Sequence, residues 1–133
     1  MRLLLVFLVL FIVACGSTYV KMEDKKINVE IADEPAEMLK GLMYRESLCD
    51  NCGILFVFNE EMDQSFWMKN TLIPLDMVFI DADYIIVDVL KAEPCTEDPC
   101  EHYNPKDKAK YVLEVNQNTF SVNDIGKKFV FNI

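Results

Sequence analysis

The amino-acid sequence predicts a mainly β protein, a small β-sandwich or distorted barrel of about seven strands with one short helix. Short apolar or alternating runs recur along the chain, and polar segments with turn-forming residues separate them. The strands also lack the regular interleaving with long amphipathic helices that marks a parallel α/β sheet. Together these patterns favour a sheet whose strands are joined mostly by turns and loops.

The expected strands differ in how deeply they are buried. Residues 27–31 alternate apolar and polar side chains, as a half-buried strand does. Residues 53–58 are continuously apolar, which predicts a strand buried on both faces. Residues 75–80 and 84–90 are expected to form a hairpin around the turn at 81–83. The remaining strands are expected at residues 64–70, 110–115 and 127–133.

One short helix is expected after the first of these strands. Asp33 suits the N-cap, Pro35 fits the first turn, and Gly41 is placed to end the helix. The apolar face of the helix is expected to come from Leu39, Leu42 and Met43.

The N-terminus predicts a lipid-anchored secreted protein. Arg2 precedes an apolar run over residues 3–14, which would span about 18 Å as a helix and is too short to cross a bilayer. The run ends at Cys15 in a pattern resembling a lipobox, so we expect a signal peptide over residues 1–15 and lipidation of Cys15. The alternative is an ordinary signal or anchor with an incidental cysteine.

The domain boundaries and location follow from this prediction. Residues 16–26 are expected to form a tether and residues 27–133 a single mostly β domain. We expect the domain on the extracytoplasmic face of a cell membrane or envelope, held to the lipid bilayer through Cys15. The formal net charge of −9 argues against a nucleic-acid partner, because phosphates would repel it.

Four further cysteines predict disulfides in an oxidising compartment. They are Cys49, Cys52, Cys95 and Cys100. Three connectivities are open, and we favour the two local pairs, 49–52 and 95–100. A zinc site or a thiol–disulfide role for these cysteines with His102 is the alternative. A hydrolytic triad is disfavoured, because the single histidine has no serine near it in the sequence.

The strand at 64–70 carries the candidate ligand-binding residues. Trp67 and Lys69 lie two positions apart and therefore share a face, where they would either line a cleft or pack with the lysine over the indole. Asp76 lies between apolar neighbours on a strand expected to be buried, so it needs a partner, for which Lys69 and Arg45 are candidates. A structural role for Asp76 is favoured over a catalytic one.

Several segments together resemble the family called domain of unknown function 192, or uncharacterised ACR. The matching pieces are Gly41-Leu-Met-Tyr-Arg45, Gly53-Ile-Leu-Phe-Val-Phe58, Phe66-Trp-Met-Lys-Asn-Thr-Leu-Ile-Pro-Leu-Asp76, Phe79-Ile-Asp-Ala-Asp83, Pro94-Cys-Thr-Glu-Asp-Pro-Cys100 with Tyr103, and Tyr111-Val-Leu-Glu114. The resemblance implies a compact, mostly β domain, often behind a signal peptide. It implies no substrate and therefore no catalytic residues. The chain departs from the family pattern at Tyr84, at residues 116–119 and in the extra pair Cys49/Cys52.

Three functional hypotheses follow. The first is a binding or accessory module of the cell envelope that takes a small or glycan-like ligand and needs no cofactor. Its candidate ligand-binding residues are Arg45, Trp67, Lys69, Asn70, Asp76 and Tyr103. The second is an envelope hydrolase in which Asp76 or Glu114 acts as acid and base, which requires both carboxylates in one groove. The third is the metal or thiol–disulfide protein described above.

Overall fold

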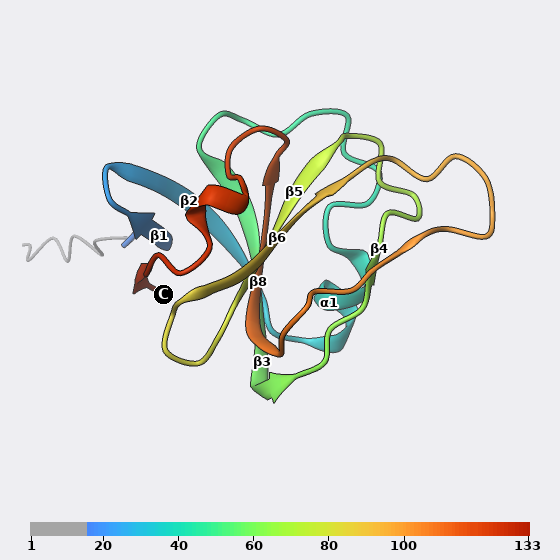
Figure 1. The fold of residues 1–133 in the computed structure, drawn as a ribbon. Helices are drawn as coiled ribbons and strands as arrows, with labels where there is room; N and C mark the ends of the chain where they lie inside the picture. Colours follow the sequence, from blue (N-terminus) through green and yellow to red (C-terminus); the bar gives the residue numbers. More distant parts are fainter. Residues whose placement is uncertain (1–15) are drawn as a thin grey trace, which may run out of the picture.

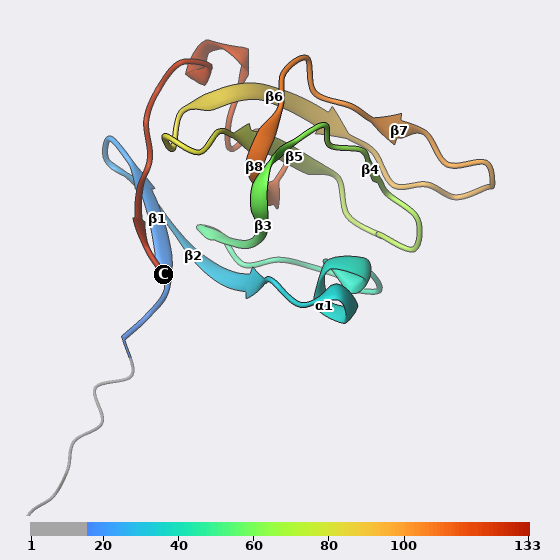
Figure 2. The same cartoon turned by 90° about the horizontal axis from the view of Figure 1, so that it is seen from below.

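The computed structural model describes residues 16–133 and confirms the mainly β class. Seven strands form one curled sheet shaped as a half-barrel, and a two-stranded ribbon lies beside it (Figures 1 and 2). The strands of the large sheet are β1 (Tyr19–Met22), β2 (Lys25–Ala32), β3 (Cys52–Met62), β5 (Leu75–Ile80), β6 (Ile86–Ala92), β8 (Ala109–Asn116) and β9 (Val130–Asn132). The ribbon consists of β4 (Phe66–Trp67) and β7 (His102–Tyr103). The helical segments are α1 (Pro35–Lys40) and a 3₁₀ turn, η1 (Val122–Asp124).

The order of the large sheet is β6-β5-β8-β3-β2-β1-β9, and the expected hairpin of β5 with β6 is confirmed. All neighbours in this sheet are antiparallel except β2 and β3, which run parallel. A parallel pair needs a crossover connection, and residues 33–51 supply it. That crossover contains α1 and Cys49, and Cys49 forms a disulfide with Cys52 at the start of β3.

Each face of the sheet carries its own apolar cluster. Successive residues of β8 point to opposite faces, so Leu113 and Val115 join one cluster while Val112 joins the other. The first cluster draws residues from β1, β2, β3, β5, β6 and β8, and Phe120 and Phe129 pack with it. The second lies on the opposite face and includes Leu42 and Met68, from the segments that follow α1 and β4. A pocket lined by Phe56, Phe66 and Glu114 lies on the face of this second cluster.

The structure moves the start of the domain. Residues 16–26 were expected to form a tether, but β1 (Tyr19–Met22) lies within them and pairs with both β2 and β9. The expectation for residues 1–15, including Cys15, lies outside the described residues. Within residues 16–133, no helix combines the length and apolarity that crossing a bilayer would require.

The expected helix is present with two corrections. Glu34 rather than Asp33 is the N-cap, and Glu34 forms a reciprocal capping box with Glu37. Gly41 ends the helix as expected, with a φ of 46°. Leu39 does not join the core, since it is 70% exposed and points outward from a helix of only six residues.

The bounds of two predicted strands differ in the structure: one strand is shorter than expected and the other is longer. The strand expected at residues 64–70 is reduced to β4, while β3 continues through the polar residues 59–62 where a turn was expected. A register shift between Val57 and Met62 in the pairing with β8 accompanies this exposed extension.

Both local disulfides form, as favoured from the sequence: Cys49 with Cys52, and Cys95 with Cys100. The sulfurs are therefore bonded to one another and are not available as thiolate ligands. No group of three or more metal-binding side chains occurs among residues 16–133. The two disulfides favour a structural role for these cysteines over a zinc site, and a thiol–disulfide role stays a prediction.

Candidate functional site

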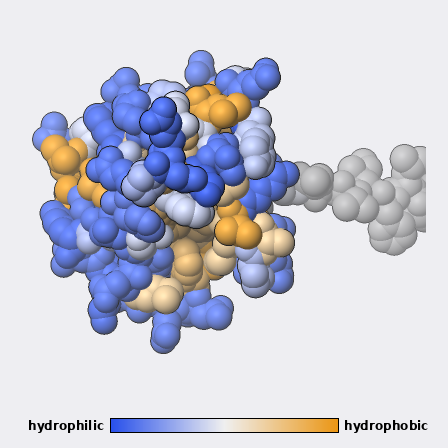
Figure 3. Space-filling view, turned by 90° about the vertical axis from the view of Figure 1, so that its right-hand side faces the viewer, coloured by the Kyte–Doolittle hydropathy of each residue, from blue (hydrophilic) through white to orange (hydrophobic). Residues whose placement is uncertain are grey.

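A pocket of about 330 Å³ opens on the side of the sheet that α1 and β4 cover. Its walls come from α1 and the turn after it, from β3, from β4 and from β8. Figure 3 faces this side of the molecule and shows hydrophobic residues gathered within a largely hydrophilic surface. The lining residues are Met38, Leu39, Lys40, Gly41, Leu42, Met43, Phe56, Phe58, Gln64, Ser65, Phe66, Trp67, Thr71 and Glu114.

Aromatic rings form much of this lining. Phe66 packs edge-on against Phe56 with ring centroids 5.1 Å apart, and against Phe58 at 6.4 Å. Such T-shaped arrangements fix the rings in place and leave part of their surface toward the pocket. Trp67, which is 40% exposed, stands at the rim.

Glu114 contributes a buried carboxyl group to the pocket. It is 5% exposed, and its place on β8 opposite Met77 of β5 and Ile54 of β3 directs it to the face of the second apolar cluster. No residue among 16–133 donates a hydrogen bond to this carboxyl or forms an ion pair with it. Burial raises the pKa of Glu114 to about 8, so the group is mainly neutral at pH 7.

Gly41 lets the turn after α1 approach Glu114. Its backbone has φ 46° and ψ −127°, which a residue with a side chain rarely adopts. A Cβ at this position would lie 3.1 Å from Phe56 Cζ and 3.9 Å from Glu114 Oε2. The glycine therefore keeps the space above the carboxyl open.

The other buried polar side chains of the pocket, Gln64 and Thr71, already have partners. Gln64 Nε2 donates to the carbonyl of Ala109 at 3.0 Å. The hydroxyl of Thr71 lies 3.4 Å from the carbonyl of Lys69. Glu114 is thus the buried polar group in this pocket that retains its full hydrogen-bonding capacity.

The ribbon of β4 and β7 holds the rim. Lys69 Nζ lies 5.3 Å from the centre of the Trp67 ring, and the His102 ring lies 6.2 Å from it. The lysine therefore does stack on the indole, as the second of the two sequence interpretations proposed. Ser65 Oγ lies 3.0 Å from His102 Nδ1, so the fold brings a serine to the histidine although none is near it in the sequence. Both residues are exposed, and no described carboxylate is hydrogen-bonded to the imidazole.

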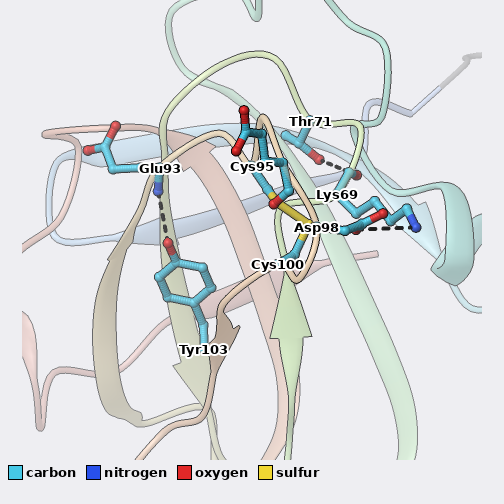
Figure 4. Close-up of a disulfide and its surroundings, with 8 residues drawn as sticks. Lys69, Thr71, Glu93, Cys95, Asp98, Cys100 and Tyr103 are labelled. Carbon is cyan, nitrogen blue, oxygen red and sulfur yellow. Dashed lines mark hydrogen bonds and ion pairs between the residues drawn. A yellow bond between two sulfur atoms is a disulfide. The ribbon is translucent and has the colours of Figure 1, made fainter.

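The Cys95–Cys100 loop clasps the segment after β4 (Figure 4). Lys69 pairs with Asp98 of this loop at 3.6 Å and forms an isolated parallel bridge with Cys95. The hydroxyl of Tyr103 accepts a hydrogen bond from the backbone N–H of Glu93 at 3.2 Å, which pins the base of the loop. Lys69 and Tyr103 thereby position the rim without lining the pocket themselves.

Two other predicted site residues lie away from the pocket lining. Arg45 forms an ion pair with Glu30 at 2.6 Å and lines a separate groove beside the Cys49–Cys52 disulfide. Asn70 has a φ of 56°, and its carbonyl accepts a hydrogen bond from Tyr44 N–H at 2.8 Å. The single cleft expected around Arg45, Trp67, Lys69 and Asn70 is therefore divided among several surfaces.

Asp76 has the structural role that the sequence favoured, but its partners differ from those expected. Its carboxylate is fully buried and accepts hydrogen bonds from the backbone N–H groups of Thr119 and Phe120 at 2.7 and 2.9 Å. Its ion-pair partner is Lys91 at 3.3 Å rather than Lys69 or Arg45. The carboxylate thus anchors the turn after β8 to the sheet.

Asp76 and Glu114 cannot share a groove. Asp76 is opposite Val115 in the register of β5 with β8, whereas Glu114 is opposite Met77. Adjacent residues on a strand point to opposite faces, so the two carboxyl groups lie on different sides of the sheet. The two-carboxylate hydrolase that sequence reasoning kept as an alternative is therefore wrong.

The fold and the pocket define a small, mostly β domain with a ligand-sized pocket on one face of its sheet. The chain belongs to the family of domain of unknown function 192, described as uncharacterised ACR, which it matches over residues 18–130. This finding confirms the resemblance noted in the sequence. No curated protein matches the chain.

Two crystal structures share the fold. A protein from Sinorhizobium meliloti 1021, described as a candidate transcription regulator, is 30% identical with a TM-score of 0.74; the match covers 87% of this chain and 94% of that one. A protein of unknown function from Novosphingobium aromaticivorans DSM 12444 is 28% identical with a TM-score of 0.72, covering 86% of this chain and 83% of that one.

Proposed function

We propose that this protein is a lipid-anchored binding module of the cell envelope that holds a small ligand in the pocket above Glu114. The observation that carries the proposal is the mostly buried carboxyl group of Glu114, which has no partner among residues 16–133 and keeps contact with the space of the pocket. A buried polar group without a partner destabilises the folded protein, and such groups are concentrated at functional sites. A ligand that hydrogen-bonds to Glu114 would supply the missing partner.

The placement of the pocket suits attachment through Cys15. The strand β1 lies at one end of the molecule, whereas β4 lies at the other (Figures 1 and 2). Cys15 precedes β1 by only a few residues. A lipid at Cys15 would hold the β1 end at the bilayer and leave the pocket facing solvent. The two disulfides support an oxidising, extracytoplasmic location.

The description of the Sinorhizobium meliloti relative as a candidate transcription regulator does not lead us to propose DNA binding for this chain. A net charge of −9 would repel the phosphate backbone. The pocket is also enclosed by aromatic and methionine side chains, which suit a small ligand better than a duplex.

The single tryptophan provides a direct assay for ligand binding. Because Trp67 stands at the pocket rim, its fluorescence should change when a set of small cations, neutral polyols and small acids is titrated and one of them binds. Any binding should weaken in the Glu114→Gln variant and persist in Glu46→Gln, which alters an exposed carboxylate elsewhere. If no compound in the set perturbs Trp67 or the neighbouring backbone amides in NMR spectra, the pocket is not a binding site.

Anchoring is tested separately from binding. Metabolic labelling with a radioactive fatty acid should mark the wild-type protein and not the Cys15→Ser variant. The variant should also move from the membrane fraction to the soluble fraction. A wild-type protein that carries no fatty acid would overturn the anchoring part of the proposal and leave the binding part intact.

A further inference from the structure

The proposed binding function, on which this inference rests, does not specify the chemical class of the ligand. The side chains that line the pocket indicate which class fits it. Its one unengaged buried polar group is an acid, and its walls include the rings of Phe56, Phe58, Phe66 and Trp67. The face of an aromatic ring carries partial negative charge, as an ionised carboxylate carries full negative charge. Both features attract a positive ligand and repel an anion.

The same features disfavour a polyol. A sugar-like ligand needs several hydrogen-bonding partners, but Gln64 already donates to Ala109 and the Thr71 hydroxyl to Lys69 within the protein. Ser65 is occupied by His102 at the exposed rim. One free carboxyl group can pair with one positive charge, but it cannot satisfy the hydrogen bonds of several hydroxyl groups. The Trp67 ring already has the ammonium group of Lys69 5.3 Å from its centre, so a ligand cation would rely mainly on the phenylalanine rings and Glu114.

The charged groups around Glu114 leave room for such a ligand. Lys40 of α1 lines the pocket but is exposed at its mouth, and it forms no ion pair with Glu114. Lys69 is engaged by Asp98 at 3.6 Å and lies over Trp67. His102 of β7 contacts Ser65 at the rim. On the strands beside Glu114, the residues opposite it are apolar.

We infer that the pocket binds a small organic cation, an ammonium group on a compact apolar body, and that the positive charge pairs with the carboxylate of Glu114. In the free protein the carboxyl carries its proton. When the cation enters, the O–H bond of the carboxyl breaks, the proton leaves to solvent, and the carboxylate pairs with the ammonium group. At a pH well below the pKa of Glu114, binding therefore releases one proton to solvent and requires no other reactant.

Proton release makes the affinity depend on pH in a defined way. Burial raises the pKa of Glu114 to about 8, so below that value the carboxyl must lose its proton for the cation to pair with it. Affinity for a permanently charged cation should therefore increase about tenfold from about pH 6 to about pH 7 and level off above about pH 8. A neutral ligand of the same shape should bind without this dependence.

Choline and its uncharged carbon isostere, dimethylbutanol, test the inference directly, since they share a shape and differ in charge. We expect the purified protein to bind choline at least about tenfold more tightly than dimethylbutanol at about pH 7.5. Butylammonium and butanol form a second matched pair. Binding is followed by Trp67 fluorescence and by calorimetry in two buffers of different ionisation enthalpy, which counts the released protons.

Three variants test whether the pH-dependent binding of choline is due to Glu114. Glu114→Gln should weaken choline binding and abolish its pH dependence. His102→Gln should keep the pH dependence, because that ring lies at the rim beside Trp67 and not at the carboxyl. Glu46→Gln should behave as wild type.

The outcomes separate the inference from the binding function on which it rests. If dimethylbutanol and butanol bind as tightly as their charged partners, the pocket is a binding site but the cation inference is wrong. If cations bind with no proton released, Glu114 does not pair with them and the inference is again wrong. If neither cations nor neutral compounds bind, both the inference and the proposed function fail.

Discussion

The replacement of Glu114 by glutamine tests whether the carboxyl is truly unpartnered, without needing a ligand. Glutamine has nearly the same shape and carries no charge at any pH. In the unfolded chain Glu114 ionises near its ordinary pKa of 4.5, whereas burial raises the pKa to about 8 in the folded protein. The stability associated with Glu114 is therefore fully present below pH 4.5 and is lost progressively as the pH increases toward about 8.

The magnitude follows from the two pKa values. Each pH unit above 4.5 and below the folded-state pKa lowers the free energy of unfolding by about 1.4 kcal/mol. At about pH 7 the loss amounts to about 3 kcal/mol, a large fraction of the total stability of a small domain. Glu114→Gln removes this loss because glutamine is neutral in both states.

The assay is urea unfolding of wild type, Glu114→Gln and the control Glu46→Gln at about pH 4 and about pH 7. Relative to wild type, Glu114→Gln should gain about 3 kcal/mol of unfolding free energy between the two pH values. Glu46→Gln should gain nothing comparable, because that carboxylate is exposed. An equal difference between wild type and Glu114→Gln at both pH values would refute the assignment of an unpartnered, buried carboxyl.

Three further predictions concern the framework of the site. Asp76→Asn should lower the free energy of unfolding by about 3 kcal/mol in urea at neutral pH, because it removes a buried charge that holds two backbone amides and a lysine; a loss near zero would contradict that role. Gly41→Ala should cost about 1–3 kcal/mol in the same measurement, since alanine does not tolerate this backbone conformation, and wild-type stability would show that the turn relaxes freely. Replacing both Cys95 and Cys100 by serine should cost about 2 kcal/mol and lower the fluorescence anisotropy of Trp67, whereas unchanged anisotropy would mean that the loop does not hold the rim.

The pattern of apolar residues correctly predicted the strands that lie between two other strands in the interior of the sheet. Residues 53–58 and 75–80 are apolar at nearly every position, and the structure places both inside the sheet. The tether was assigned wrongly because Tyr19–Met22 is a short strand in a polar context, and what stabilises it is pairing with the distant β9. Such a partner cannot be identified from local pattern alone.

The candidate site was predicted only in part, for a related reason. Trp67 was identified because it shares a strand face with Lys69, whereas Glu114 was named only as a possible acid or base in the hydrolase alternative. The sequence does not show that Glu114 and Asp76 point to opposite faces, because their relative placement depends on the register between β5 and β8. Gly41 and Phe56 could not be assigned to the pocket, since the close approach of the turn after α1 to β3 is a tertiary contact.

The pairing of β1 with β9 has a consequence for assembly and self-association. The first strand of the sheet remains an uncovered edge until Val130–Asn132, near the end of the chain, docks against it. Pairing between such distant segments is slow, because a long loop must close before the contact contributes. A chain that lost β9 would expose the backbone hydrogen-bonding groups of β1, and open strand edges of this kind template pairing with other chains. In the folded protein, the three-residue strand β9 therefore covers an edge of β1 that would otherwise favour aggregation.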